Sequence, residues 1–199
     1  MQITLKYKVK LEFVMQFPRS KMAFSLLASV AFSMAAHTDE PLPHPLAFMF
    51  GEWVGPASGQ TPSGAFQIMQ TERVGTMLDG DAVVIEGRGY NDTGETMFNA
   101  FAVVSQTGLD QSWEMRSYAR GRAGTFPFEL TDTGYVWSLP AGPNARMIYT
   151  ATFEGDTWRQ VGAYTPNDGE PRQTFQMTLT RVGGTDWPAG NPVSPRADE

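Results

Sequence analysis

Turn-forming residues recur at intervals of about ten through most of this chain. Asp79-Gly80, Asn91 to Gly94 and Asn167 to Gly169 combine residue types that tolerate the positive φ of tight hairpin turns. Between such turns apolar and polar residues alternate, as over residues 66–71, which is typical of a half-buried strand. The spacing therefore predicts short antiparallel strands joined by hairpins.

About ten strands are expected. They lie near 51–55 and 66–71 and over 82–90, 96–106, 112–119, 125–130, 135–139, 146–153, 158–165 and 173–182. An apolar segment at 46–50 precedes them and is expected to form a short helix that plugs one end. Short, even connections favour an all-β fold with a single antiparallel up-and-down β-barrel over residues 46–183, which leaves no open sheet edge. The alternative is a two-sheet sandwich, which needs longer crossovers.

The first 36 residues have the pattern of an export signal. Arg19 and Lys21 precede an apolar run of about 15 residues that ends in small residues at Ala35 and Ala36, which is typical of a cleaved signal peptide. The run is shorter than the ~20 residues that a membrane-spanning helix needs, so no membrane span is expected. A buried N-terminal helix is the alternative. We expect residues 1–36 to be removed and the protein to be periplasmic or secreted.

Both segments that flank the predicted barrel are rich in proline. Residues 37–45 should form an extended lead, because proline cannot enter the interior of a sheet, and residues 184–199 should form a mobile tail. The translation start remains open between Met1 and Met15.

Charge and residue usage exclude several classes of function. Residues 1–36 carry 5 basic groups and 1 acidic group, so the remainder carries 15 − 5 = 10 basic and 21 − 1 = 20 acidic groups, a net charge of -10. Such an acidic body repels nucleic acid. The chain has no cysteine, every lysine lies in residues 1–36, and the two histidines are His37 and His44. Thiol, Schiff-base and histidine-dependent triad chemistry therefore lack their residues, and we predict no catalytic or metal-binding residue.

The sequence Gly51-Glu52-Trp53-Val54-Gly55 resembles the Gly-x-Trp opening of the calycin superfamily, which includes lipocalins, fatty-acid-binding proteins and nitrobindin-like haem barrels. The chain is most similar to a bacterial family of lipocalin-like barrels whose function is not established, over residues 46–187. The resemblance implies a barrel with its ligand inside. It also implies that Trp53 lies at the closed end beneath Arg181 of the last strand, which makes both residues structural.

Haem is not expected, because the haem-binding relatives hold iron with a histidine late in the barrel and no histidine follows His44. Tyrosine or methionine could ligate iron instead, but nothing singles one out. We therefore predict no cofactor.

Alternation along the strands gives a set of candidate lining residues. They are Phe101, Trp113, Met115, Trp137, Tyr149, Trp158, Tyr164 and Phe175. Arg116 and Arg159 are possible partners for a ligand carboxylate, as in fatty-acid-binding barrels, although Arg116 faces outward if Trp113 and Met115 face inward. The alternative is that the same aromatic side chains simply fill the core.

Three functions remain open. The first is binding of a small apolar or amphipathic molecule by a monomer or weak dimer acting as carrier, scavenger or sensor. The second is a small barrel enzyme that uses a buried carboxylate–arginine or tyrosine–arginine pair; the strand carboxylates are Glu72, Glu86, Glu114 and Glu129, and the sequence does not choose among them. The third is a filled barrel that acts through a partner protein.

Overall fold

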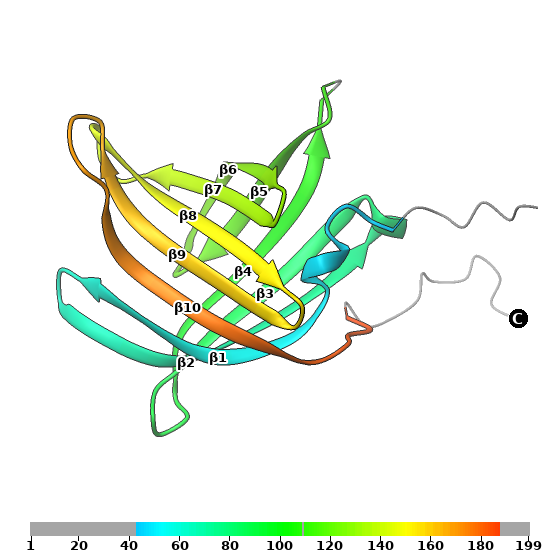
Figure 1. Cartoon of the computed structure of the whole chain (residues 1–199), viewed down its shortest axis with the longest axis horizontal. Coiled ribbons are helices and arrows are strands. Elements are labelled where there is room, and N and C mark those ends of the chain that lie inside the picture. The colour runs from blue at the N-terminus through cyan, green and yellow to red at the C-terminus, as the bar shows by residue number, and fades with distance from the viewer. Residues whose placement is uncertain (1–42, 109, 188–199) are drawn as a thin grey trace, which may run out of the picture. The chain divides into compact units, whose positions relative to one another are not determined.

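The structure is a computed structural model that describes residues 43–108 and 110–187. It contains ten β-strands and two short 3₁₀ helices (Figure 1). The strands are β1 (Gly51–Thr61), β2 (Gly64–Met77), β3 (Ala82–Tyr90), β4 (Thr96–Thr107), β5 (Ser112–Ala119), β6 (Arg122–Thr131), β7 (Gly134–Pro140), β8 (Ala145–Glu154), β9 (Thr157–Pro166) and β10 (Arg172–Gly183). The helices are η1 (Ala47–Met49) and η2 (Leu78–Gly80).

The strands form one closed antiparallel barrel in which each strand pairs with its neighbours in the sequence. Pairing of β1 with β10, from Val54 opposite Thr180 to Gly59 opposite Phe175, closes the sheet. The predicted up-and-down barrel is therefore confirmed, and closure satisfies the backbone groups that a sandwich would leave at its edges.

The connection between β5 and β6 is shorter than predicted. The strand after 112–119 was expected to begin at residue 125, whereas β5 and β6 pair up to Ala119 and Arg122, which leaves a two-residue turn. Arg120 and Gly121 both have positive φ, of 51° and 72°. Such a turn matches the twist of the flanking strands, so a non-glycine residue is held in the left-handed region here.

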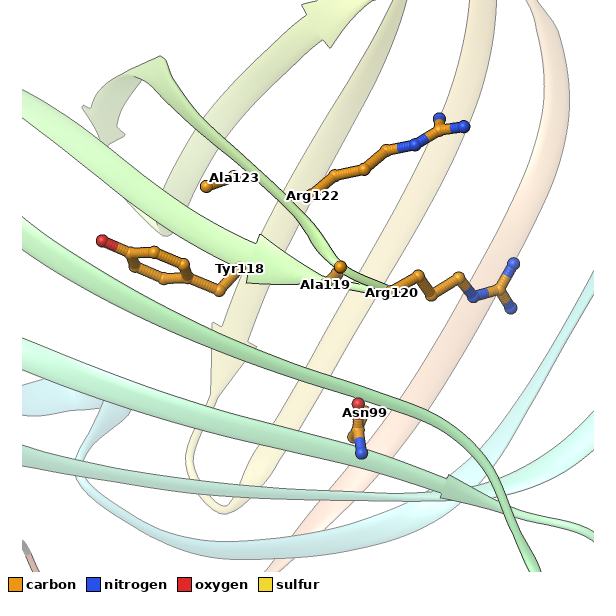
Figure 2. Close-up of a pocket in the computed structure, with 7 residues that line it drawn as sticks. Asn99, Tyr118, Ala119, Arg120, Arg122 and Ala123 are labelled. Atoms are coloured by element: carbon orange, nitrogen blue, oxygen red, sulfur yellow. The ribbon is translucent and has the colours of Figure 1, made fainter.

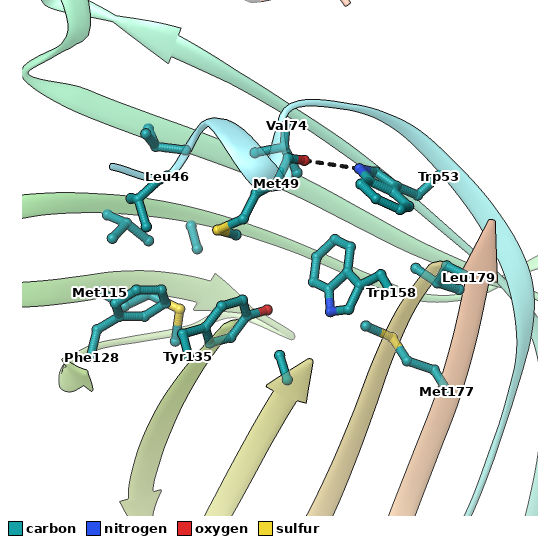
Figure 3. Close-up of a cluster of buried hydrophobic side chains, with 14 of the residues drawn as sticks. Leu46, Met49, Trp53, Val74, Met115, Phe128, Tyr135, Trp158, Met177 and Leu179 are labelled. Atoms are coloured by element: carbon teal, nitrogen blue, oxygen red, sulfur yellow. Dashed lines mark hydrogen bonds between the residues drawn. The ribbon is translucent and has the colours of Figure 1, made fainter. Parts of the chain in front are cut away.

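Helix η1 covers one end of the barrel, as the sequence predicted. Leu46 and Met49 are fully buried, and the carbonyl oxygen of Met49 accepts a hydrogen bond of 2.9 Å from Nε1 of Trp53 (Figure 3). His44 fastens the preceding turn, because its Nδ1 accepts a bond from the Leu46 backbone N–H and its Nε2 lies 3.0 Å from the Gly80 carbonyl oxygen. We call this the plugged end.

Packing is uneven along the barrel axis. Several fully buried side chains lie at the plugged end, among them Trp53, Val74 and Leu179 (Figure 3). At the other end, the open end, inward-facing side chains such as Phe66 remain partly exposed. These side chains face the inside of a closed sheet, so part of the inner surface at this end is accessible to solvent.

Several predictions lie outside the described residues. These are the signal peptide at 1–36, most of the lead at 37–45 and residues 188–199 of the tail. Within residues 43–108 and 110–187, no helix is long and apolar enough to cross a membrane.

Candidate ligand-binding site inside the barrel

An arginine and a tryptophan close the plugged end together. Arg181 Cζ lies 4.0 Å from the centroid of the Trp53 ring, in cation–π geometry. The guanidinium also donates hydrogen bonds to the Phe48 carbonyl oxygen, at 2.9 Å, and to the Asp156 carboxylate, at 3.0 Å. These contacts join the last strand, the plug and the β8–β9 turn.

Aromatic side chains of β6, β7, β8 and β10 gather on the inner face of the open half. The rings of Trp137 and Tyr149, which are opposite in register on β7 and β8, stack with centroids 4.4 Å apart and planes 8° from parallel. The ring centroids of Phe126 and Trp137 are 5.9 Å apart, and those of Phe175 and Tyr149 are 6.1 Å apart. All four side chains are partly exposed. We call this set the aromatic wall; it gives the open half a continuous, partly exposed aromatic inner surface.

A second set of inward-facing side chains is polar. Gln70 and Glu72 come from β2, and the Gln70 amide donates a 2.8 Å hydrogen bond from Nε2 to Glu72 Oε1. Tyr135 on β7 donates a 3.0 Å hydrogen bond from its hydroxyl to Oε1 of Gln160 on β9. We call these four residues the polar cluster. Gln70 and Gln160 are buried, at 4% and 8% exposure, so each depends on its partner to offset lost hydration.

Two glycines of β3 make room for the polar cluster. Gly87 pairs with Glu72, and Gly89 pairs with Gln70. A Cβ atom at Gly87 would lie 2.8 Å from both carboxylate oxygens of Glu72, and one at Gly89 would lie 2.5 Å from the Ile68 side chain and 3.2 Å from Gln70 Oε1. Any larger residue would therefore displace the carboxylate from the wall of the barrel.

The surroundings of Glu72 disfavour its ionised form. Burial raises the pKa of this carboxyl to about 7; the Gln70 hydrogen bond lowers it, and the negative charge of Glu86 raises it further. Glu72 keeps some accessible surface, although its carboxyl lies deep among protein atoms. Desolvation of the carboxyl itself therefore dominates its pKa.

Tyr135, on the other side of the polar cluster, is affected by the negative charge of Glu72. Burial raises the pKa of Tyr135 well above its ordinary value, and the negative charge of Glu72 adds to this effect. Nε1 of Trp158 faces this region, and the Trp158 and Tyr135 rings meet edge to face at 6.2 Å (Figure 3). This nitrogen is buried and has no acceptor in hydrogen-bond geometry among the described residues. It nevertheless lies close enough to the Tyr135 hydroxyl to lower the pKa of that group, against the larger effect of burial. A fully buried donor without an acceptor is unusual in a native protein.

The structure places most of the predicted lining residues on the inner face. They are Trp113, Met115, Trp137, Tyr149, Trp158, Tyr164 and Phe175. Met115 and Trp158 lie in the packed plugged half, at 5% and 2% exposure, and the other five are partly exposed. The predicted lining residues are therefore fully packed in the plugged half and partly exposed in the open half.

Three predicted site residues do not face the interior. Phe101 is 37% exposed and contacts Tyr118 and Trp187 on the outer wall, because its neighbours Ala102 and Val104 take the inner face of β4. Arg116 and Arg159 are also exposed. Successive residues of a strand point to opposite faces, and the neighbouring Met115 and Trp158 take the inner face. The interior prediction for Phe101 is therefore wrong, and neither arginine can meet a ligand carboxylate inside the barrel.

The polar cluster was not predicted from the sequence, although a signal existed. Phe66, Ile68 and Gln70 share one face of β2, and the same alternation continues to Glu72 and Val74. The other strand carboxylates Glu86, Glu114 and Glu129 lie on the opposite parity of their strands. Once the inner face of β2 is known, the alternation of side chains along each strand places Glu72 inside the barrel and the other three carboxylates outside.

Two hollows lie on the outside of the sheet. One, of about 410 Å³, is lined by Asn99, Tyr118 and the β5–β6 hairpin, from which Arg120 and Arg122 extend in the same direction (Figure 2). The other, of about 260 Å³, lies beside Phe101 and Trp187. Both are shallow surface features over β3 to β6. No group of three histidine, aspartate or glutamate side chains that could hold a metal ion occurs in the part of the chain that the structure describes.

No protein-family model matches this sequence, and no curated protein matches it. The fold is similar to that in the crystal structure of Rv2717c from M. tuberculosis, with a TM-score of 0.51 and 10% sequence identity. The match covers 68% of this chain and 94% of that chain. At 10% identity, this similarity shows a shared fold and nothing about function.

Proposed function

We propose that this protein binds a small hydrophobic or amphipathic molecule inside the open half of its barrel. The observation that carries the proposal is the aromatic wall, whose four side chains face the interior of a closed sheet and yet remain partly exposed. When a ligand removes apolar surface from water, the free energy of binding becomes more favourable by about 25 cal/mol per Å² of surface buried.

The polar cluster supports an amphipathic ligand. It lies deeper in the barrel than the aromatic wall, so a molecule that packs its apolar part on Trp137 and Tyr149 can direct a polar group toward Glu72 and Gln70. A few placed polar groups in a mostly apolar site are typical of small-molecule binding. We further propose that the mature protein is periplasmic or secreted, acts as carrier, scavenger or sensor without a cofactor, and is a monomer or weak dimer.

The proposal is tested by native mass spectrometry of protein purified from its own host, followed by organic extraction and by titration with the neutral probe Nile red. We expect a reproducible bound mass and probe binding. Tyr149→Ala, which removes part of the aromatic wall, should weaken probe binding about 10-fold or more, since the truncated ring contributes about 1.5–3 kcal/mol of buried contact.

Tyr118→Ala is the matched control, because Tyr118 is 53% exposed on the outer wall. It should leave probe binding unchanged. Clean apo-protein that ignores the probe, or probe binding that depends on Tyr118 and not on Tyr149, would refute the proposal and would favour the outer surface as a partner-binding face.

A second candidate function rests on Glu72. A carboxyl whose pKa lies at about 7 can both accept and donate a proton near neutral pH, as a general acid or base requires. Its predicted arginine partner is absent among the described residues, so such an enzyme would use Glu72 with Tyr135 instead. Deuterium incorporation from D₂O into the α-carbon of small carbonyl compounds, lost in Glu72→Gln, would support this function.

A further inference from the structure

The interior of this barrel presents a carboxyl group without a cationic partner. Glu72 Oε1 accepts the Gln70 amide, and no arginine of the described residues forms an ion pair with Glu72. We propose that the ligand carries a protonated amine and that Glu72, held by Gln70, is the group that binds it. This inference rests on the proposed function and names the chemical class of its ligand.

The neighbours of Glu72 on every adjoining element leave its charge unmatched. On β1 it lies opposite Trp53, and on β3 opposite Gly87. Across the barrel stand Tyr135 and Gln160, which bond to each other. None of these groups carries a positive charge.

The charged groups on the neighbouring elements are already engaged. Arg73, which follows Glu72 on β2, pairs with Glu52 at 3.2 Å. Glu86, on the outer face of β3, adds negative charge and pairs with Arg88. Arg181 stacks on Trp53 and donates to Asp156 and Phe48. At the open rim, Arg120 and Arg172 lie over the rings of Phe98 and Tyr164, at 5.5 and 5.7 Å. The inside of the barrel near Glu72 is therefore acidic.

This arrangement selects among head groups by charge. A carboxylate ligand would place a second negative charge beside Glu72 in a region of low dielectric constant, which is unfavourable. A hydroxyl could form only a neutral hydrogen bond. An ammonium donates charge-assisted hydrogen bonds that are roughly twice as strong, and it supplies the counter-charge that the interior lacks.

The aromatic wall suits the same class of ligand. Its rings provide apolar contact for the hydrocarbon part, and the faces of tryptophan and tyrosine attract a cation in their vicinity. The ligand expected is thus a hydrophobic amine, in contrast to the carboxylate ligand that interior arginines would have indicated.

Binding of an amine should be coupled to proton release. Below neutral pH the Glu72 carboxyl is partly protonated, and an ammonium beside it favours the ionised form. Complex formation at pH 6 should therefore release close to one proton, and affinity should rise from pH 5 to pH 8 as Glu72 loses its proton. Tyr135 does not reproduce this window, because burial raises its pKa well above its ordinary value. Glu86 faces outward from the sheet and does not meet a ligand inside the barrel.

The test compares octylamine, octanol and octanoic acid, which share one hydrocarbon chain, by calorimetry with the intact mature protein. Titrations at pH 6 in two buffers of different ionisation enthalpy count the protons released. We expect octylamine to bind at least about 10-fold more tightly than octanol and octanoic acid to bind most weakly.

Glu72→Gln should abolish the preference for the amine and the proton release, while octanol binding is retained. Glu129→Gln is the matched control, because Glu129 is exposed on the outer face of β6. It should change neither quantity.

The two proposals fail in different ways. Octanol or octanoic acid binding as tightly as octylamine would overturn the amine inference and leave the barrel as a binder of apolar molecules. An amine preference that survives in Glu72→Gln would also overturn it. If none of the three compounds and no Nile red enters the protein, both proposals are refuted.

Discussion

Replacing Glu72 with glutamine should stabilise this protein, and the gain should grow with pH. Burial raises the pKa of this carboxyl from 4.5 to about 7 in the folded state, so the folded protein holds a proton that the unfolded chain releases between these values. The stabilisation from that proton is fully present below the pKa of the unfolded chain and is lost as the pH rises through about 7. Above neutral pH the folded protein contains an ionised, poorly solvated carboxylate.

The size of the effect follows from the difference in pKa. A gap of about 2.5 pKa units corresponds to about 3 kcal/mol at pH 8, since each unit contributes about 1.4 kcal/mol. At pH 5 the same linkage gives about 1 kcal/mol. Glutamine is nearly isosteric with the protonated acid and can still accept the hydrogen bond from Gln70. Its advantage over glutamate should therefore rise by about 2 kcal/mol between pH 5 and pH 8.

The measurement is urea denaturation followed by tryptophan fluorescence at several pH values from 5 to 8. Comparing variant with wild type at each pH cancels the titration of all other groups. Glu129→Gln, on the outer face, should give a difference that is flat with pH. A difference for Glu72→Gln that is equally flat, within about 0.5 kcal/mol, would show that the Glu72 carboxyl is well solvated or paired in the folded protein, and would contradict the reasoning above.

Two further predictions concern the neighbours of the site. Trp53→Phe should destabilise the protein by about 1–2 kcal/mol more than Trp158→Phe, because only Trp53 loses a hydrogen bond, to Met49, whereas the Trp158 nitrogen has no acceptor; equal losses of unfolding free energy in denaturant titrations would contradict this account. Gly87→Ala should weaken octylamine binding about 10-fold by displacing Glu72, since its Cβ would lie 2.8 Å from both carboxylate oxygens; calorimetry with octanol, which should bind nearly as before, is the control.

The sequence contained most of what the fold required. Strands β3 and β5 begin and end at the predicted residues, 82–90 and 112–119, because turn residues bound each run and alternation identifies it. The plug before β1 was also predicted, from an apolar segment that follows the proline-rich lead. These are local signals, and antiparallel hairpins between sequence neighbours convert local signals directly into topology.

Alternation determined the inner face for most strands, but it gave the wrong face for Phe101. A run of apolar residues on both faces of β4, including Phe101, Ala102 and Val104, leaves the parity of that strand undecided in the sequence. Register with β3 and β5 settles it: Ala102 and Val104 enter the core, and Phe101 meets Trp187 outside.

The sequence by itself determined a closed antiparallel barrel with a plugged end and an aromatic interior. Only the tertiary structure decided which carboxylate is inside and what stands around it. Glu72 becomes a site because closure brings β2 to face β7 and β9, and because Gly87 leaves it room. The physical reason is that desolvation and missing counter-charges depend on groups distant in sequence. The spacing of turns can specify a barrel, but it does not determine which charged groups face one another across its interior.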